Sequence, residues 1–409
     1  MLLVAALAAA RPRVGRGRSR ILDVALIATV TAIALQLVPL PPALHDALSP
    51  HAQAVEDAIH FGGTVGWRPL SLNPAGTAIA LFVDLLALAV FWTTRESLAG
   101  SGMRTLLRTV LGAGIVVSVA AIVGAATRGP TSHLIFGVFE PTDRAARPYG
   151  PFVNRNEMAM WLLLALPLVI GYCTARIRRR TASAVDPLDA TTVWFAGGAC
   201  ILIATLVLSL SRSGIVAAAV EACLALGLSL KAVERRRHAL LATAGIVAAA
   251  AAIALAMPRT SELIGRFDRT LEVRGADART AIWRETRAMM RDFPVYGVGA
   301  GAYPTGMLVY QQGSRLMFNN HAHDEYLQIL AEGGLLVGIP FAMAALAFAT
   351  DLTGRLRADL SAAYWIRAGA ATGIAGALLQ SVWEVGLAAP ANALLFAAVC
   401  AIAIHHDRA

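Results

Sequence analysis

The sequence predicts an all-α, polytopic integral membrane protein, and three observations lead to this prediction. Of the 409 residues, 57% are hydrophobic and only 15% are charged, whereas soluble domains are typically about a quarter charged. The mean hydropathy is +0.62. Several apolar runs reach roughly 18 residues or more, which is enough for a helix to cross the hydrocarbon core of a bilayer. The whole chain, 1–409, is therefore expected to form a single polytopic membrane domain.

About ten apolar runs are long enough to be membrane-spanning helices. They are expected at 21–40, 76–94, 104–126, 157–174, 191–210, 213–230, 238–257, 334–350, 363–386 and 390–405. The first ten residues are apolar but too few to cross, and the basic stretch RPRVGRGRSR follows them. This beginning is either the flank of an eleventh helix or a short interfacial stub.

The distribution of arginine predicts how these helices are oriented. If successive spans alternate in direction, the basic stretches ARIRRRT and KAVERRR fall on the same side of the membrane. Short loops rich in Lys and Arg face the cytoplasm, so that side is predicted to be cytoplasmic. The formal charge of +9 then reflects anchoring at anionic membrane lipids, and no nucleic-acid partner is expected.

The long segment 258–332 falls on the outward side and is predicted to be a large periplasmic loop that carries short helices. Within it, Ile282, Met289, Met290 and Phe293 form one apolar stripe at helical spacing. The stretch PVYGVGAGAYP then breaks this helix, and HDEYLQILAEGGLLVGIP is expected to turn helical and run into span 334–350. The polar stretch NNHAHDEYLQILAEGG therefore lies where a surface helix enters the outer leaflet.

His321 and His323 are the first candidates for chemistry in that stretch. Histidine has an ordinary pKa of about 6.5, so either imidazole suits a general base near neutral pH. The alternative is a pair of interfacial histidines that only make structural hydrogen bonds. With Asp324 and Glu325 they supply metal-ligand atoms, but residues two apart on a helix point in different directions and no third ligand is evident. No metal site is predicted.

Arginines on the outward side are candidates for binding phosphate. Arg212 lies in LSLSRSGIV, a turn so tight that the side chain sits at the membrane edge, where ionisable residues are often functional. Its planar fork of donors suits phosphate oxygens, although snorkelling to lipid headgroups is the alternative. Arg279, Arg155 and Arg147 also lie on outward segments. Each is either a diphosphate or glycan ligand or a solvated surface residue.

Two further patterns lead to weaker hypotheses. Asp84, Glu221 and Glu384 lie within or at the edges of apolar runs and together suit the polar path of a transporter. However, no inverted repeat or pair of broken helices supports transport. The stretch GVGAG resembles a phosphate-binding glycine loop, but it neither follows a predicted strand nor faces cytosolic nucleotides.

Several motifs, taken in order, resemble those of the O-antigen ligase and polymerase superfamily. The stretch NNHAHDEYLQILAEGGLLVGI resembles the signature of that family: a histidine, a polar residue, an aromatic, leucine, an acidic residue and glycines that open a span. WRPLSLNP, GPFVNRNEMA and LSRSG agree in the expected order. So does the pattern R-x-x-x-W…P-x-x-G-x-G that begins at Arg279. The similarity covers roughly residues 60 to 390.

The resemblance implies a transferase that acts on a glycan linked to undecaprenyl diphosphate, at the periplasmic face of the bacterial inner membrane. It implies that His323 is the catalytic base, with His321 in reserve, and that Asp324 orients the imidazole where the family more often has Asn. The diphosphate-binding arginines of the family correspond to Arg212 and Arg279. Because the diphosphate already activates the donor, neither a metal nor another cofactor is expected.

The resemblance leaves the acceptor open. A lipid A–core sugar would make the protein an O-antigen ligase, which is favoured narrowly over a polymerase. The chain length and the single large late loop suit a ligase or a polymerase better than a protein-modifying enzyme. The end of another glycan repeat would make it an O-antigen or exopolysaccharide polymerase, and a Ser or Thr hydroxyl a protein O-oligosaccharyltransferase. A transporter of lipid-linked glycan or of a small solute is the alternative from another class of protein.

Overall fold

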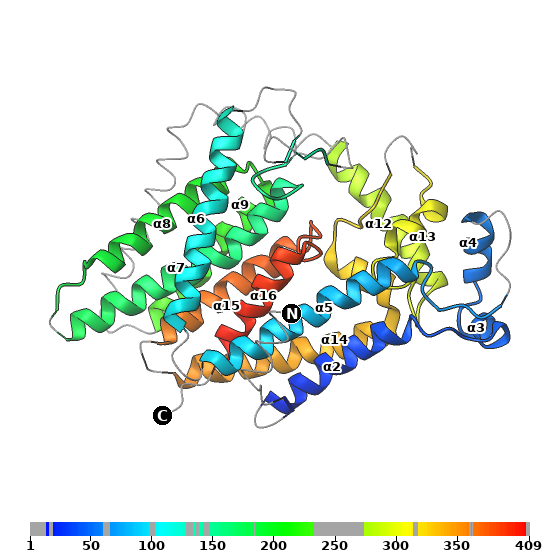
Figure 1. Ribbon diagram of the computed structural model, residues 1–409, viewed down its shortest axis with the longest axis horizontal. Helices are drawn as coiled ribbons and strands as arrows, with labels where there is room; N and C mark the ends of the chain where they lie inside the picture. Colours follow the sequence, from blue (N-terminus) through cyan, green and yellow to red (C-terminus); the bar gives the residue numbers. More distant parts are fainter. Residues whose placement is uncertain are drawn as a thin grey trace. The chain divides into compact units, whose positions relative to one another are not determined.

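The computed structural model consists of α-helices joined by turns and short loops over the part of the chain that it describes (Figure 1). The described residues divide into two compact units, and each is considered by itself below. Unit 1 comprises residues up to 92, 270–351 and 381–385, and unit 2 comprises 93–269, 352–380 and 386–409. The structure describes residues 14–405 except 16–18, 60–65, 99–102, 128–133, 136–138, 142–147, 184, 232–273, 314–317, 360 and 362.

Unit 1 combines apolar helices with short helices from the outward segments. Its elements are α2 (Arg20–Leu35), α3 (Pro42–Leu48), α4 (Ala52–Ile59), α12 (Arg274–Asp292), α13 (Tyr303–Tyr310) and most of α5 (Pro74–Leu98) and α14 (Glu325–Ala358). Apolar side chains of α4, α12, α13 and the start of α14 form one buried cluster, which includes Val55, Met289, Tyr303 and Ala331. A second cluster joins α2, α5 and α14.

The segment between α12 and α13 crosses α14 where that helix is kinked. Gly334 has φ 55°, outside the helical range, and a Cβ there would lie 2.5 Å from the carbonyl oxygen of Val295. The N–H groups of Val298 and Gly299 donate to the carbonyls of Ala331 and Glu332, at 3.0 and 2.9 Å. The glycines of GVGAG thus permit a close backbone crossing, which accounts for the motif without a phosphate ligand.

Unit 2 is a helical bundle around one almost fully buried helix. Its elements are α6 (Met103–Thr127), α7 (Arg155–Ala182), α8 (Ala190–Leu208), α9 (Arg212–Lys231), α15 (Ala363–Gln380) and α16 (Pro390–Ala403). Every side chain of α7 from Met158 to Val169 is buried, as expected for a helix that is apolar on all sides. The other helices of the bundle pack around α7, and α15 makes the most extensive contact.

Six helices are long and apolar enough to cross a membrane: Pro74–Leu98, Met103–Thr127, Arg155–Ala182, Ala190–Leu208, Arg212–Ser229 and Glu325–Ala358. The prediction of a polytopic α-helical membrane protein is supported, while the count of ten or eleven spans stays a prediction. At the predicted spans 21–40, 363–386 and 390–405 the helices are shorter than expected, since α2 ends at Leu35, α15 at Gln380 and α16 at Ala403. The predicted span 238–257 and any helix in the first ten residues lie outside the described part of the chain.

Candidate functional site

The apolar stripe of α12 packs that helix against the rest of unit 1 and leaves two side chains with hydrogen-bond donors, Arg279 and Trp283, on a neighbouring face. Ile282, Met289 and Phe293 are buried, as the periodicity predicts. Arg279 and Trp283 are four residues apart, so they lie one above the other on the helix. Both reach residues near His323, as the next contacts show.

The backbone around Ala322 is fixed from two directions. The Trp283 indole N–H donates to the carbonyl oxygen of Ala322 at 3.1 Å, and the Gln328 amide oxygen accepts from the Ala322 N–H at 3.1 Å. The next residue, His323, has φ 50°, a left-handed conformation that is uncommon outside glycine. Such strain persists only where the surrounding structure over-determines it, and it concentrates at functional sites.

Glu384 is the carboxylate that faces this histidine. It lies in the turn after α15, and the carbonyl oxygen of Ser381 in the same turn accepts the Glu325 N–H at the start of α14 at 2.9 Å. This bond holds the turn beside the histidine loop. The Glu384 side chain is only 6% exposed, so its charge requires close partners.

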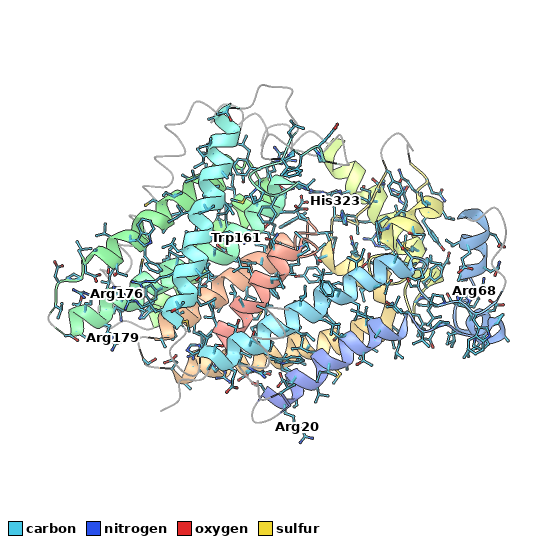
Figure 2. All side chains as sticks on the ribbon, in the orientation of Figure 1. Arg20, Arg68, Trp161, Arg176, Arg179 and His323 are labelled. Carbon is cyan, nitrogen blue, oxygen red and sulfur yellow. The ribbon has the colours of Figure 1, made fainter. Side chains whose placement is uncertain are left out.

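Glu384 has two cationic or ionisable partners, one on each carboxylate oxygen. Arg279 Nη2 donates to Oε1 at 2.9 Å, and His323 Nδ1 lies 3.7 Å from Oε2. The first is a charge-assisted hydrogen bond; the second is longer than a hydrogen bond but close enough for strong attraction to an imidazolium. The side chains of Arg279 and His323 remain 35% and 38% exposed, so both are accessible to a substrate. Figure 2 shows the position of His323.

His321 lies behind this group. Its Nδ1 is 3.4 Å from the Gln328 side-chain nitrogen, and the same nitrogen lies 3.4 Å from Glu332 Oε1. Burial lowers the pKa of His321 below its ordinary 6.5, and the nearby His323 lowers it further. Of the two histidines, His323 thus has Glu384 as its ion-pair partner, while His321 contacts Gln328 and is only weakly influenced by the charge of Glu384.

Asp324 occupies the N-cap of α14. Its carboxylate accepts the Leu327 N–H at 3.0 Å, and its carbonyl accepts the Gln328 N–H at 3.0 Å. Both bonds satisfy donors that a helix start leaves unpaired. Among the contacts of the described residues, the carboxylate near His323 is that of Glu384, and Asp324 instead fixes where α14 begins.

The remaining predicted arginines belong to unit 2 or are not described. Arg212 is the first residue of α9, after a turn with Leu210 at φ 54°. The Ser211 hydroxyl accepts the Gly214 N–H at 3.2 Å, so the predicted tight turn is present. Arg155 is the first residue of α7, whose N-cap is Asn154. Arg147 lies outside the described residues.

Sequence reasoning assigned Glu384 to a different hypothesis. As an acid at the end of an apolar run, Glu384 suits a transport path, whereas the structure pairs it with Arg279 and His323. It lies 61 positions beyond His323 in the sequence, and only the fold brings the two together. The sequence does indicate that Glu384 needs a partner, because it lies at the end of an apolar run, where a carboxylate near the membrane is costly unless it is paired.

No group of three His, Cys, Asp or Glu residues that could hold a metal ion occurs in the described part of the chain. The site therefore consists of an imidazole and a guanidinium that share one buried carboxylate. This arrangement can accept a proton from a hydroxyl and, close by, offset negative charge.

Comparison with known families agrees with the motifs. A search of curated proteins finds no match to the chain. Residues 197–342 match a family model described as O-antigen ligase. The matched segment includes Arg212, Arg279 and both histidines. Over residues 197–342 the resemblance to the O-antigen ligase and polymerase superfamily is thereby confirmed.

Proposed function

We propose that the protein is an inner-membrane glycosyltransferase. It transfers a glycan from undecaprenyl diphosphate to an acceptor hydroxyl at the periplasmic face. The observation that carries the proposal is the pairing of Glu384 with both His323 and Arg279. A base and a cation held on one carboxylate match the two demands of this reaction: removal of a proton from the acceptor and stabilisation of a diphosphate leaving group.

The base is His323. Glu384 lies on its Nδ1 side, which favours the tautomer with the proton on Nδ1 and leaves the lone pair of Nε2 for the acceptor. Nε2 takes the proton of the acceptor O–H as the acceptor oxygen attacks the anomeric carbon. The 3.7 Å separation from Glu384 would shorten once the imidazole is charged, because catalytic contacts tighten in the reacting complex.

The leaving group is the lipid diphosphate. The bond between the anomeric carbon and the phosphate oxygen breaks as the new glycosidic bond forms, with inversion at that carbon. Arg279 offsets the charge that develops on the diphosphate, an interaction that is stronger in the transition state than in the ground state. The diphosphate already activates the donor, so the proposed reaction involves no ATP and no metal.

Other residues have supporting roles in this proposal. Asp324 positions the histidine loop through the N-cap of α14, and His321 remains the alternative base. Arg212 is proposed to bind diphosphate, as the resemblance implies, and so, with less support, are Arg155 and Arg147. An Arg212→Lys variant should lose most transfer, because an ammonium cannot replace the planar fork. The exposed Arg287 on α12, changed to Lys in the same assay, is the matched control.

We favour lipid A–core as the acceptor, which would make the protein an O-antigen ligase. Polymerisation of O-antigen or exopolysaccharide and protein O-glycosylation use the same donor and the same base. The transport alternative relied partly on Glu384, and the pairing of this residue with Arg279 and His323 supports transfer instead. Movement of labelled lipid-linked glycan across proteoliposomes without a new glycosidic bond would reverse that preference.

The test is the banding pattern of surface glycolipid in a deletion strain complemented with wild-type protein or with His323→Ala. For a ligase we expect a full ladder with the wild-type protein. The deletion strain without a complementing gene and the strain with His323→Ala should show only bare core. Core carrying a single repeat would indicate a polymerase. A full ladder in the uncomplemented deletion strain would refute both the ligase role and the polymerase role. His321→Ala, at matched expression, shows which of the two histidines is the base. Removal of the base should lower the rate of transfer by about 100-fold or more.

A further inference from the structure

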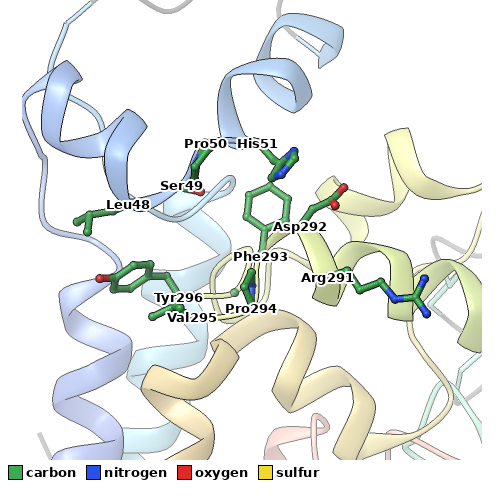
Figure 3. Close-up of a pocket in the computed structure, with 11 residues that line it drawn as sticks. Leu48, Ser49, Pro50, His51, Arg291, Asp292, Phe293, Pro294, Val295 and Tyr296 are labelled. Atoms are coloured by element: carbon green, nitrogen blue, oxygen red, sulfur yellow. The ribbon is translucent and has the colours of Figure 1, made fainter.

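A pocket of about 300 Å³ lies in unit 1 at the C-terminal end of α12 (Figure 3). One wall is the corner between α3 and α4, from Leu48 to His51, and the other is the segment from Arg291 to Gly297. Its volume is at the lower end of the range for pockets that bind small molecules. None of its lining residues belongs to the His323 site.

The pocket contains a buried hydroxyl that lacks a hydrogen-bond partner. The Ser49 residue is 4% exposed, lines the cavity, and its Oγ has no partner among the described residues. Burying a hydroxyl without a hydrogen bond is unfavourable. A polar atom of a ligand in this pocket would remove that cost.

The other lining groups combine polar and apolar character in a small space. His51, Arg291 and Asp292 supply hydrogen-bond donors and acceptors from both walls, and Leu48, Pro50 and Val295 add apolar surface. One guanidinium and one carboxylate nearly cancel in charge, so the pocket has no strong preference for a phosphate. A ring that carries several hydroxyl groups satisfies this mixture of donors, acceptors and apolar surface.

The walls of the pocket are held in place by their own contacts. Asp292 accepts a hydrogen bond from the Tyr310 hydroxyl. The buried Arg68 (Figure 2) links the two helices of the α3–α4 corner. Its guanidinium donates to Asp46 on α3 and to Glu56 on α4, at 2.6 Å each. A preformed pocket loses less conformational entropy when it binds a ligand.

The geometry points to a second carbohydrate site: we propose that this pocket binds one sugar ring of a glycan chain, away from the bond that is made. The proposal rests on the proposed function, because it needs a glycan at the His323 site. Arg279 and Arg291 are twelve residues apart on α12, which is about 18 Å along a helix. A sugar in the pocket is therefore several units from the reacting carbon. It belongs either to the donor glycan or to the acceptor glycan.

Binding of free oligosaccharides to the purified full-length protein in lipid nanodiscs tests the proposal without relying on transfer. The probes are the repeat-unit oligosaccharide and the core oligosaccharide, each cleaved from the surface glycolipid of the wild-type strain. His51→Ala and Arg291→Ala change exposed side chains and should not disturb folding. Ser49→Ala removes the unpartnered hydroxyl, and Arg287→Ala, on the same helix but outside the pocket, is the control.

Wild-type protein should bind one of the probes, and the His51→Ala Arg291→Ala double variant should bind it at least about tenfold more weakly. Binding should be unchanged in Arg287→Ala. Loss of repeat-unit binding would identify the donor glycan, and loss of core binding the acceptor glycan. Wild-type protein that binds neither probe, or pocket variants that bind as tightly as the control, would overturn the proposal. If the pocket variants lose glycan binding as expected while His323→Ala transfers glycan as the wild type does, the pocket stands and the assignment of His323 fails.

Discussion

His323 is held in an unfavourable backbone conformation by its neighbours. Its φ of 50° costs about 1–3 kcal/mol for a residue with a side chain. The hydrogen bonds from Trp283 and to Gln328 on either side of Ala322 and the N-cap at Asp324 counter that cost. In this conformation the imidazole Nδ1 lies 3.7 Å from Glu384 Oε2.

Glu384→Gln should lower kcat of glycan transfer by about tenfold or more. The amide preserves the shape of the side chain but removes the negative charge that holds Arg279 and faces the imidazole of His323. KM should change less than kcat, because the attraction to the imidazolium develops in the transition state. Transfer kinetics with the purified protein measure both constants.

Asp57→Asn, a change at an exposed carboxylate of the same unit, is the control for charge. Equal kcat in Glu384→Gln and wild type would remove Glu384 from the site. A lower kcat together with a large drop in Tm would point to a purely structural carboxylate.

The thermal stability of the protein should depend on pH through His321. Burial and the neighbouring His323 lower its folded-state pKa below 6.5, so the unfolded chain binds more protons between that lowered pKa and 6.5. Its contribution to stability is therefore complete above pH 6.5 and is lost as pH falls through the lowered pKa. Other groups that face His321 are Gln328 and Glu384.

His321→Gln should accordingly show a smaller fall in Tm between pH 7 and pH 5 than the wild type. Scans at one fixed rate are needed, since unfolding of membrane proteins is often irreversible. Parallel curves for His321→Gln and wild type would contradict the prediction.

At the scale of elements, glycines set how closely α7 and α15 approach. A Cβ on Gly369 would lie 2.3 Å from the carbonyl oxygen of Pro167, and one on Gly171 would lie 2.4 Å from that of Trp365. Gly369 and Gly373 are four residues apart on α15. This is the spacing of small residues at which membrane helices pack backbone to backbone.

Gly369→Ala should lower Tm by about 3 °C or more, because the new methyl group meets backbone that cannot move aside without separating the helices. Gly197→Ala on α8 is the matched control, since a Cβ there meets nothing within 4 Å and alanine is the better helix former. Thermal melts of both variants in the same detergent measure the two Tm values. A Gly369→Ala protein as stable as Gly197→Ala would mean that the two helices separate easily.

At the scale of the whole molecule, the arginines predict the orientation in the membrane. Arg176 and Arg179 lie at the C-terminal end of α7 (Figure 2), a predicted cytoplasmic end. Gln312, in the segment after α13, belongs to the predicted periplasmic loop. The proposed reaction requires that the histidine side face the periplasm.

A cysteine at Gln312 should react with a membrane-impermeant maleimide in intact spheroplasts, and one at Arg179 only after the membrane is permeabilised. Both positions are exposed, so access to the reagent rather than burial decides the result. The wild-type protein, with its own four cysteines, provides the background. Labelling of Arg179→Cys in intact spheroplasts would show that the orientation is the reverse of the predicted one and would contradict the proposed periplasmic site.

Much of the fold was predictable because hydropathy and periodicity act locally. The apolar runs 76–94 and 104–126 lie within observed helices, and the stripe of Ile282, Met289 and Phe293 is buried as predicted. The ends of α2 and α15 were not predictable, since apolar residues continue beyond the last helical turn. There the chain turns back to make tertiary contacts, such as the bond between the Ser71 N–H and the Gln36 carbonyl.

For the site, the sequence by itself predicted the candidate reactive groups. The order of motifs led to His323 and Arg279 and to the resemblance to the O-antigen ligase family, because a base and a cation are the groups that the proposed chemistry needs. Only the tertiary structure decided which carboxylate joins them. Asp324 is adjacent in sequence but caps a helix, whereas Glu384 is distant in sequence and is carried to the site by the turn after α15. Spacing along a chain predicts neighbours within one helix; partners from separate helices depend on packing, which the local pattern does not encode.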